Sequence, residues 1–274
     1  MKFRIKLDGY DSYLTQIALV TGGNSGIGLE TVRALLRKGS KVYMAARNEA
    51  KARNEMANLL QDPTTAKGAV DFLHLDLASF RSIEQFVREL GRREQRLDLL
   101  FNNAGLVIPN SEGQKTAEGY EIHMGVNALG VYYLTVLLLP LLRISYQHNP
   151  TRPPRVCFTS SLAHRAAPSC GFDPTDPSGA HIRFRVLPTY MQAYANSKMA
   201  VILGMLRAHI QLRANYSVCT AKMASSCMCQ LHTAMLATPA ISRQVSHATP
   251  DHFQQYFSAT LLSLTCFIPP SSAP

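Results

Sequence analysis

The chain of 274 residues contains no tryptophan and is poor in acidic residues, with 18 Asp and Glu against 28 Lys and Arg. The resulting net charge of +10 attracts anions in general and does not by itself define a partner. A nucleic-acid site needs basic residues clustered with stacking aromatic rings. Here the basic residues are spread over the first two thirds of the chain, so nucleic acid is not expected as a partner.

Paired cysteines and long hydrophobic runs are also lacking. The six cysteines form no CxxC pair, which excludes the usual zinc spacing and favours free thiols in a reducing compartment. No apolar core follows the basic N-terminus, as a secretory signal requires. The apolar run at residues 131–142 is shorter than the ~20 residues that span a bilayer. The expected location is the cytoplasm, with or without peripheral attachment to a membrane.

Apolar runs and helical patterns alternate through the first 212 residues. Short continuous apolar runs predict buried strands at residues 17–20, 42–45, 70–75, 97–101 and 155–159. Helical spacing predicts helices at residues 27–36, 49–60, 79–91, 119–143 and 190–212. Ser79 is a candidate N-cap, and Pro140 is expected to kink its helix. This alternation predicts an α/β fold, a doubly wound parallel Rossmann-like sheet with helices on both faces.

A glycine-rich turn at residues 22–28 (GGNSGIG) follows the first predicted strand and opens the first helix. Gly22 permits a tight turn, Gly26 lets the backbone approach a pyrophosphate, and Gly28 allows close helix packing. The helix N-terminus adds free N–H groups and a positive dipole end. We therefore predict a dinucleotide site that contains Gly22, Asn24, Ser25, Gly26, Ile27 and Gly28.

The end of the second predicted strand, residues 45–48 (AARN), carries no acid. An acid at this place usually receives the ribose hydroxyls of NAD. Arg47 can instead pair with a 2′-phosphate, because a guanidinium suits phosphate geometry. The strand end favours NADP(H) over NAD(H), the alternative being that Arg47 is an ordinary solvated arginine.

Tyr194 and Lys198 lie four residues apart and share one face of the predicted helix. A free phenol is too weak an acid to be ionised at neutral pH. The charge of Lys198, with that of an oxidised nicotinamide, stabilises the phenolate. Tyr194 can then take a proton from an alcohol or return one to a carbonyl oxygen. Such pairs also occur on helix surfaces without a catalytic role.

These motifs, in this order, resemble those of the classical short-chain dehydrogenase/reductase (SDR) family. Further matches follow the predicted strands. Asp76 and Leu77 follow the third strand, residues 102–105 (NNAG) follow the fourth, and Ser160 and Ser161 follow the fifth. Asn127 lies in the helix after the fourth strand. The resemblance covers residues 15–213. It is strongest to retinol dehydrogenase-like, WW-domain oxidoreductase-like and fungal members, some of which act in secondary metabolism.

The resemblance implies a role for each matching residue. Asp76 contacts the adenine ring, Asn127 orders a water that links Lys198 to solvent, and the serine holds the reacting oxygen. The implied catalytic set is Asn127, Ser161, Tyr194 and Lys198, with Ser160, or simple turn capping by the serines, as the alternative. The cofactor set extends to Arg47, Asp76, Leu77, Asn103, Ala104, Gly105, Tyr194 and Lys198. Hydride passes directly to or from the nicotinamide, so no metal is expected. A homodimer is also implied.

His164 follows the serines and raises the alternative of a Ser–His hydrolase. No GxSxG elbow is present, and a hydrolase leaves the glycine-rich turn unexplained. We therefore expect His164 to be a polar loop residue. The Pro- and Gly-rich residues 166–188 are expected to form a wall of the substrate pocket.

After Lys198 the resemblance weakens. Residues 216–221 fit a sixth strand, but no Pro-Gly pair follows, and Gly204 is the last glycine. The final 76 residues hold four Lys or Arg, one acid and four of the six cysteines. We hypothesise an altered reading frame, a retained intron or a degenerate end, with C-terminal strands missing or altered. This predicts an NAD(P)-binding Rossmann domain at residues 1–215 and an atypical segment at residues 216–274.

The expected function is that of an NADP-dependent oxidoreductase. It transfers hydride between the nicotinamide and a small-molecule alcohol, aldehyde or ketone, expected to be lipophilic, in lipid or secondary metabolism. The alternative is a nucleotide-binding protein with little or no activity, because residues 216–274 depart from the family pattern.

Overall fold

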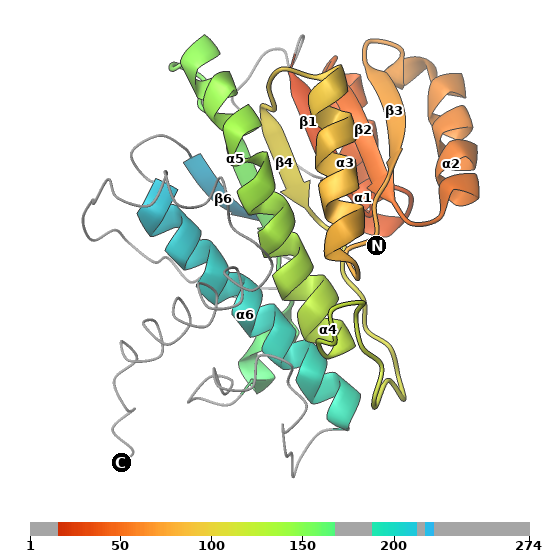
Figure 1. The fold of residues 1–274 in the computed structure, drawn as a ribbon. Coiled ribbons are helices and arrows are strands. Elements are labelled where there is room, and N and C mark those ends of the chain that lie inside the picture. The colour runs from red at the N-terminus through yellow and green to blue at the C-terminus, as the bar shows by residue number, and fades with distance from the viewer. Residues whose placement is uncertain (1–15, 168–187, 213–216, 222–274) are drawn as a thin grey trace.

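A computed structural model describes residues 16–167, 188–212 and 217–221. Within them six parallel strands form one sheet in the order β3-β2-β1-β4-β5-β6 (Figure 1). The strands are β1 (Ile17–Thr21), β2 (Lys41–Ala46), β3 (Ala69–His74), β4 (Leu99–Asn102), β5 (Arg155–Thr159) and β6 (Ser217–Ala221). The strand order reverses at β1, where the chain crosses from β3 to β4. The doubly wound parallel sheet expected from the sequence is thus confirmed.

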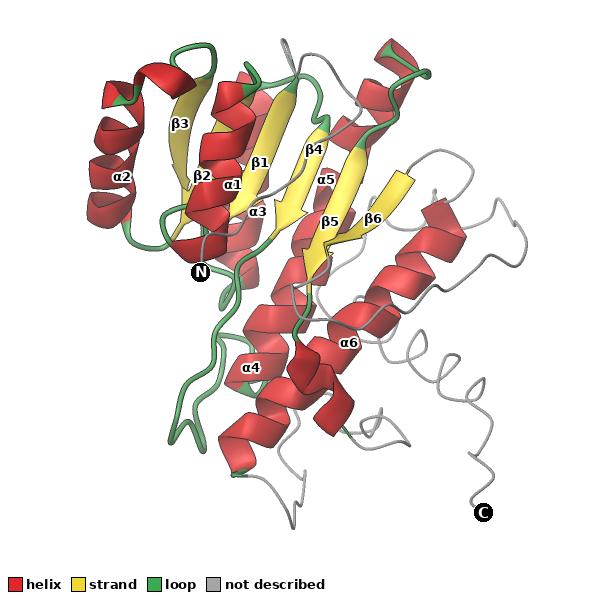
Figure 2. Cartoon of the chain, turned by 180° about the vertical axis from the view of Figure 1, so that it is seen from behind, coloured by secondary structure: helices red, strands yellow, loops and turns green. Residues whose placement is uncertain are grey.

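Helices cover both faces of this sheet. The α-helices are α1 (Gly26–Arg37), α2 (Glu49–Gln61), α3 (Phe80–Arg93), α4 (Ile122–Met124), α5 (Val131–His148) and α6 (Thr189–Leu212). Helices α3, α5 and α6 lie on one face, and α1 and α2 lie on the other (Figures 1 and 2). A π-helix, Gly125–Gly130, joins α4 to α5, and 3-10 helices occur at Pro63–Thr65 and Leu162–Ala166.

Strand β1 shows why the predicted strand segments are apolar at every position. Ile17 and Leu19 of β1 pack in the cluster formed with α3, α5 and α6. Ala18 and Val20 point to the opposite face and pack in the cluster formed with α1 and α2. Successive side chains alternate between faces, and here both faces are covered. Burying one such leucine contributes roughly 1.5–3 kcal/mol, which stabilises the centre of the sheet.

Several predicted boundaries are confirmed, and one helix prediction is wrong in its extent. Strand β5 has the predicted bounds, β6 confirms the sixth strand expected at residues 216–221, and Ser79 caps α3 by accepting from the Ser82 N–H at 3.3 Å. The helix expected from residue 119 begins only at Ile122, because Gly119 has a φ of +88° that no right-handed helix accepts. Pro140 lies on the exposed side of α5, and the helix continues past it to His148.

The long apolar helix belongs to the core. The helical stretch at residues 122–148 is long and apolar enough to cross a membrane. An 18-residue window within it has a mean hydropathy of 1.8, but 67% of that window is buried inside the protein. Its apolar side chains pack against the sheet, α3 and α6. The packing therefore favours a core helix over a membrane span for the apolar run at residues 131–142.

Two predictions fall on residues outside the described part. The predicted pocket wall at residues 166–188 is described only at its ends, and residues 222–274 are not described. The division of the chain near residue 215 stays a prediction.

Candidate active site

The predicted cofactor residues gather at the carboxyl ends of the parallel strands. A hollow of about 360 Å³ lies at this edge of the sheet. Of the predicted residues, those that line it are Gly22, Asn24, Ser25, Arg47, Asp76, Leu77, Asn103, Ala104 and Gly105. Gly26, Ile27, Gly28, Tyr194 and Lys198 are not in its lining. The hollow thus joins the glycine-rich turn to the ends of β2, β3 and β4, as a dinucleotide requires.

Positive φ values and close packing explain the glycines of the turn. Gly22 has a φ of +65° and Gly26 a φ of +52°, values that favour glycine. A Cβ added at Gly28 would overlap the Gly22 carbonyl oxygen and would lie 2.6 Å from Asn103 Nδ2. The N-terminus of α1 therefore comes closer to the turn than any other residue type at position 28 would allow.

Thr21 ties this turn to the segment after β4. Its Oγ1 accepts hydrogen bonds from the backbone N–H groups of Asn103 at 3.0 Å and Ala104 at 2.9 Å. Asn103 Nδ2 donates in return to the Thr21 carbonyl at 3.1 Å. Thr21 was missed by the sequence reasoning, although a threonine that ends a buried strand before a glycine-rich turn is a usable signal. Asn103 therefore holds the shape of the turn as well as lining the hollow.

Two basic residues lie where the ribose end of a dinucleotide is expected. Arg47 follows β2 directly, and Lys51 lies one helical turn further on in α2. Both line the hollow, and both are exposed to solvent. Between them, the Asn48 side chain caps α2 by accepting from the Lys51 N–H at 2.9 Å. Lys51 was not predicted, but its spacing of four residues from Arg47 is a signal that it shares the same surface.

Asp76 lies in the turn between β3 and α3. Its Oδ1 accepts from the Ala78 N–H at 3.0 Å, and its own N–H donates to Ser82 Oγ at 3.0 Å. The first bond orients the carboxylate and the second fixes the backbone of Asp76 at the rim of the hollow. The position is compatible with the adenine contact that the resemblance implies.

Of the described cations at this edge, Lys198 has the most strongly shifted pKa. Its side chain lies on α6, with the residue only 4% exposed, and Nζ donates to the Thr159 carbonyl at 3.1 Å. Nζ also lies 5.8 Å from the centroid of the Tyr194 ring. Burial lowers the pKa of Lys198 to about 8, because the charged form loses hydration. Since this pKa is still above 7, the ammonium form prevails at neutral pH.

Asn127 lies in the π-helix and is 1% exposed. Its Oδ1 accepts from the Leu106 N–H at 2.7 Å, and its Nδ2 donates to the Leu106 carbonyl at 2.9 Å and to Ser197 Oγ at 3.0 Å. A Cβ added at Gly105 would lie 2.9 Å from Lys198 Nζ and 3.2 Å from Asn127 Oδ1. The structure thus brings Asn127, Gly105 and Lys198 together from three separate segments.

The two serines after β5 make different contacts. Ser160 Oγ donates to the Lys198 carbonyl at 3.0 Å, so its proton is used within the protein. Ser161 Oγ accepts from the Ala163 N–H at 3.2 Å and caps the 3-10 helix Leu162–Ala166. That bond uses a lone pair and leaves the Ser161 proton to another acceptor. Ser161 therefore caps the turn, which the sequence analysis gave as an alternative to catalysis. The cap does not prevent Ser161 from donating its proton to a reacting oxygen.

Gln192 links the serine turn to the helix of Tyr194 and Lys198. Its Nε2 donates to the Ala166 carbonyl at 2.8 Å and to Asn196 Oδ1 at 3.1 Å, and the residue is 5% exposed. His164 Nδ1 lies 2.5 Å from the Ser161 carbonyl rather than from its hydroxyl. This contact favours the polar loop role expected for His164 over a Ser–His pair.

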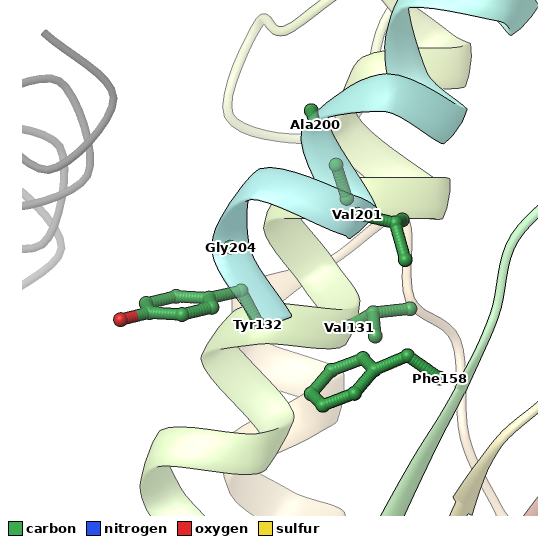
Figure 3. Close-up of a pocket in the computed structure, with 7 residues that line it drawn as sticks. Val131, Tyr132, Phe158, Ala200, Val201 and Gly204 are labelled. Atoms are coloured by element: carbon green, nitrogen blue, oxygen red, sulfur yellow. The ribbon is translucent and has the colours of Figure 1, made fainter. Parts of the chain in front are cut away.

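A second, smaller hollow lies away from this edge, between α5 and α6. Its lining is apolar apart from one phenol: Ala128, Val131, Tyr132, Phe158, Ala200, Val201 and Gly204. Figure 3 shows the Tyr132 hydroxyl pointing away from Val131 and Phe158. The hollow offers no charged group for hydride chemistry and belongs to the seam between the two helices. In the described residues no group of three His, Cys, Asp or Glu side chains is arranged to hold a metal ion.

Comparisons with known proteins agree with the fold and the motifs. A family model described as short chain dehydrogenase matches residues 16–168. A short-chain dehydrogenase/reductase of Phomopsis amygdali is 40% identical over 160 residues, which cover 58% of this chain and 48% of that protein. Retinol dehydrogenase 11 of Mus musculus is 41% identical over 150 residues, 54% of this chain and 44% of that protein.

A solved structure extends the agreement to the fold. The short chain dehydrogenase from Salmonella enterica serovar Typhi is 26% identical, with a TM-score of 0.55 over 79% of this chain and 76% of that one. The chain spans about half the length of the curated relatives named above. The family match nevertheless covers more than half of this chain and includes its turn, its NNAG segment and its serines. The chain therefore belongs to the short-chain dehydrogenase/reductase family, which uses a nicotinamide dinucleotide as cofactor.

Proposed function

We propose that the chain transfers hydride between NADP(H) and a lipophilic alcohol or carbonyl compound. The observation that carries this proposal is the buried Lys198 ammonium, which lies beside Tyr194 on α6 and against Gly105, the residue that Asn127 also approaches. Tyr194, Lys198 and Asn127 come from segments that only the folded chain brings together. A charged lysine is retained here despite the cost of burial, which is typical of a functional site.

Each residue of the site has a part in the proposed reaction. The bound cofactor supplies or accepts the hydride. Lys198 holds its positive charge beside the Tyr194 ring, and the Tyr194 hydroxyl exchanges a proton with the substrate oxygen. Ser161 donates its free hydroxyl proton to that same oxygen and holds it in place. Asn127 keeps the loop after β4 in position through two hydrogen bonds to Leu106, and a third bond, to Ser197 Oγ, joins it to α6.

The residues around the hollow support NADP(H) over NAD(H). No acid follows β2, and two cations, Arg47 and Lys51, line the hollow instead. A 2′-phosphate would find charge-assisted partners there, whereas ribose hydroxyls would lack a carboxylate acceptor. The glycines at positions 22 and 28 leave the backbone space that a pyrophosphate needs.

Two exposed apolar side chains support a lipophilic substrate. Val107, after β4, is 49% exposed, and Leu162, next to Ser161, is 53% exposed. Val107 lies in the loop after β4, and Leu162 begins the 3-10 helix after β5, so both follow strand ends at the carboxyl edge of the sheet. One relative, by its name, acts on retinol, itself a lipophilic alcohol.

Thermal unfolding with each cofactor, followed by turnover, tests the proposal. A ligand at 100 times its dissociation constant stabilises the fold by ~2.7 kcal/mol, so NADPH should raise the midpoint clearly and NADH less. NADPH-dependent reduction of nonanal, followed at 340 nm, then tests hydride transfer, with Tyr194→Phe as control. Cofactor binding without turnover of nonanal or retinal would favour the alternative, a nucleotide-binding protein with little activity. No response to either cofactor would contradict both functions.

A further inference from the structure

His123 is a fully buried titratable residue that the proposed reaction does not use. It lies in α4 and is 0% exposed. Its Nε2 accepts from the Ile108 N–H at 3.1 Å, and its Nδ1 lies 2.7 Å from Glu121 Oε1. A backbone N–H can only donate, so Nε2 carries no proton, and Nδ1 must donate to the carboxylate. The two contacts therefore select one tautomer of a neutral imidazole.

The partner of Nε2 belongs to the loop after β4. His123 and Asn127 are one helical turn apart, and they bind alternate residues of this loop, Ile108 and Leu106. The preceding residue, Gly105, lies against Lys198 Nζ and lines the cofactor hollow. The loop is thus held at two successive points, and neither contact was predicted from the sequence, which named Asn127 as a site residue but not its bonds to Leu106.

The imidazole also contacts the proposed catalytic phenol. The His123 and Tyr194 rings meet edge to face, with centroids 6.3 Å apart and an interplanar angle of 72°. Glu121 anchors the imidazole from the other side, while its second oxygen caps α4 by accepting from the Met124 N–H at 2.7 Å. His123 therefore joins three parts of the site: the loop after β4, the start of the Asn127 helix and the Tyr194 ring.

We infer that His123 is a positioning residue, which holds the loop after β4 against Asn127 and Tyr194 in the geometry that hydride transfer requires. This inference rests on the proposed function. Loss of the Ile108 bond would free a partly buried N–H and let the loop shift relative to Lys198. Small displacements of this kind lower kcat more than they weaken binding at the distant Arg47 end of the cofactor.

Three substitutions separate the contacts of His123. His123→Gln places an amide oxygen near the Nε2 position and keeps an acceptor for Ile108. His123→Asn places its amide near Nδ1, which keeps the Glu121 contact and loses the Ile108 bond. His123→Phe keeps the ring against Tyr194 and loses both hydrogen bonds. His148→Phe, at the exposed end of α5, is the matched control.

Two readouts are measured on each variant after cooperative unfolding has been verified. The first is hydrogen exchange of the Ile108 amide in the cofactor-free chain, and the second is kcat and KM for NADPH with nonanal. We expect His123→Phe and His123→Asn to lose roughly 10- to 100-fold in kcat, with a KM within about twofold of wild type. Their Ile108 amides should exchange faster. His123→Gln should retain most of both properties, and His148→Phe should match wild type.

The outcomes distinguish this inference from the proposed function. A wild-type kcat in His123→Asn and His123→Phe overturns the inference alone. An equal loss in all three variants, with Ile108 still protected, also overturns it, because it indicates a merely structural role. A wild-type chain that reduces neither nonanal nor retinal overturns the proposed function and this inference with it. If His123→Phe does not fold, the contrast between His123→Gln and His123→Asn carries the test.

Discussion

The two halves of the site are built in different ways. The half expected to hold the phosphates consists of one continuous turn, residues 22–28, whose shape depends on glycine backbone and on the start of α1. The half expected to carry the chemistry joins three distant segments, namely the π-helix of Asn127, the turn of Ser160 and Ser161, and the helix of Tyr194 and Lys198. A local turn is set by short-range sterics, whereas the catalytic set depends on the whole sheet and on α6.

This difference predicts that the halves fail separately. Changes in the catalytic half should abolish turnover and leave cofactor binding intact. Changes in the glycine-rich turn should remove binding and also weaken the fold, because the turn is packed against the NNAG segment through Thr21. Four substitutions test the two halves, and the largest effect is expected in the catalytic half.

Tyr194→Phe should affect the catalytic half alone. Removing the only hydroxyl of this side chain removes proton transfer, which contributes about 10²- to 10⁴-fold to the rate. We expect kcat with nonanal to fall by that factor while the NADPH-induced shift in unfolding midpoint is unchanged. A variant that lost the shift as well would show that the two halves are not separable.

Lys198→Met should change how stability depends on pH. In the folded chain burial lowers the pKa of Lys198 to about 8 from its usual 10.5. Between these values the unfolded chain binds more protons, so the free energy of unfolding rises with pH. The rise attributable to Lys198 is about 2 kcal/mol between pH 7 and pH 9.5.

Urea unfolding of the cofactor-free chain at these two pH values measures that rise. Lys198→Met should lack it, whereas Lys67→Met, at an exposed position, should keep the wild-type difference. If Lys198→Met kept the wild-type difference in the free energy of unfolding between the two pH values, burial in the folded chain would not lower the pKa of Lys198.

Gly28→Ala should affect both binding and stability. The added methyl would overlap the Gly22 carbonyl, and relieving such overpacking costs about 1–3 kcal/mol. Chemical denaturation should show that loss, and the response to NADPH should disappear. Gly91→Ala in α3 is the control, since nothing lies within 4 Å of its added Cβ and it should stabilise the helix slightly. Equal effects of the two substitutions would contradict the steric argument.

Arg47→Ala should act only on the choice of cofactor. Losing one charge-assisted hydrogen bond costs about 1.5–3 kcal/mol, or roughly 10- to 100-fold in the dissociation constant for NADPH. Affinity for NADH should change little, and Arg88→Ala, on the exposed side of α3, should change neither. Titration of each cofactor by its fluorescence measures both constants. A parallel loss of NADH affinity would mean that Arg47 does not contact the 2′-phosphate.

Much of the fold could be read from the apolar pattern, because buried parallel strands such as β1 and β5 must be apolar on both faces. The start of the helix near Asn127 was misjudged, because the positive φ of Gly119 interrupts a pattern that otherwise looks helical. Contacts such as Thr21 with Asn103, or His123 with Ile108, could not be predicted. Each joins residues through a side chain and a backbone group, and no periodicity along the chain records such a pair.

The sequence by itself determined the alternation of strands and helices, the glycine-rich turn and the Tyr194–Lys198 spacing, since all of these depend on neighbours within a few residues. Only the tertiary structure decided which side chains share the site. In the folded chain Lys198 lies against Gly105, and Ser160 Oγ donates to the Lys198 carbonyl in α6. Lys51 and Arg47 line the same hollow. The physical reason is that burial, desolvation and hydrogen-bond satisfaction depend on residues far apart in the chain.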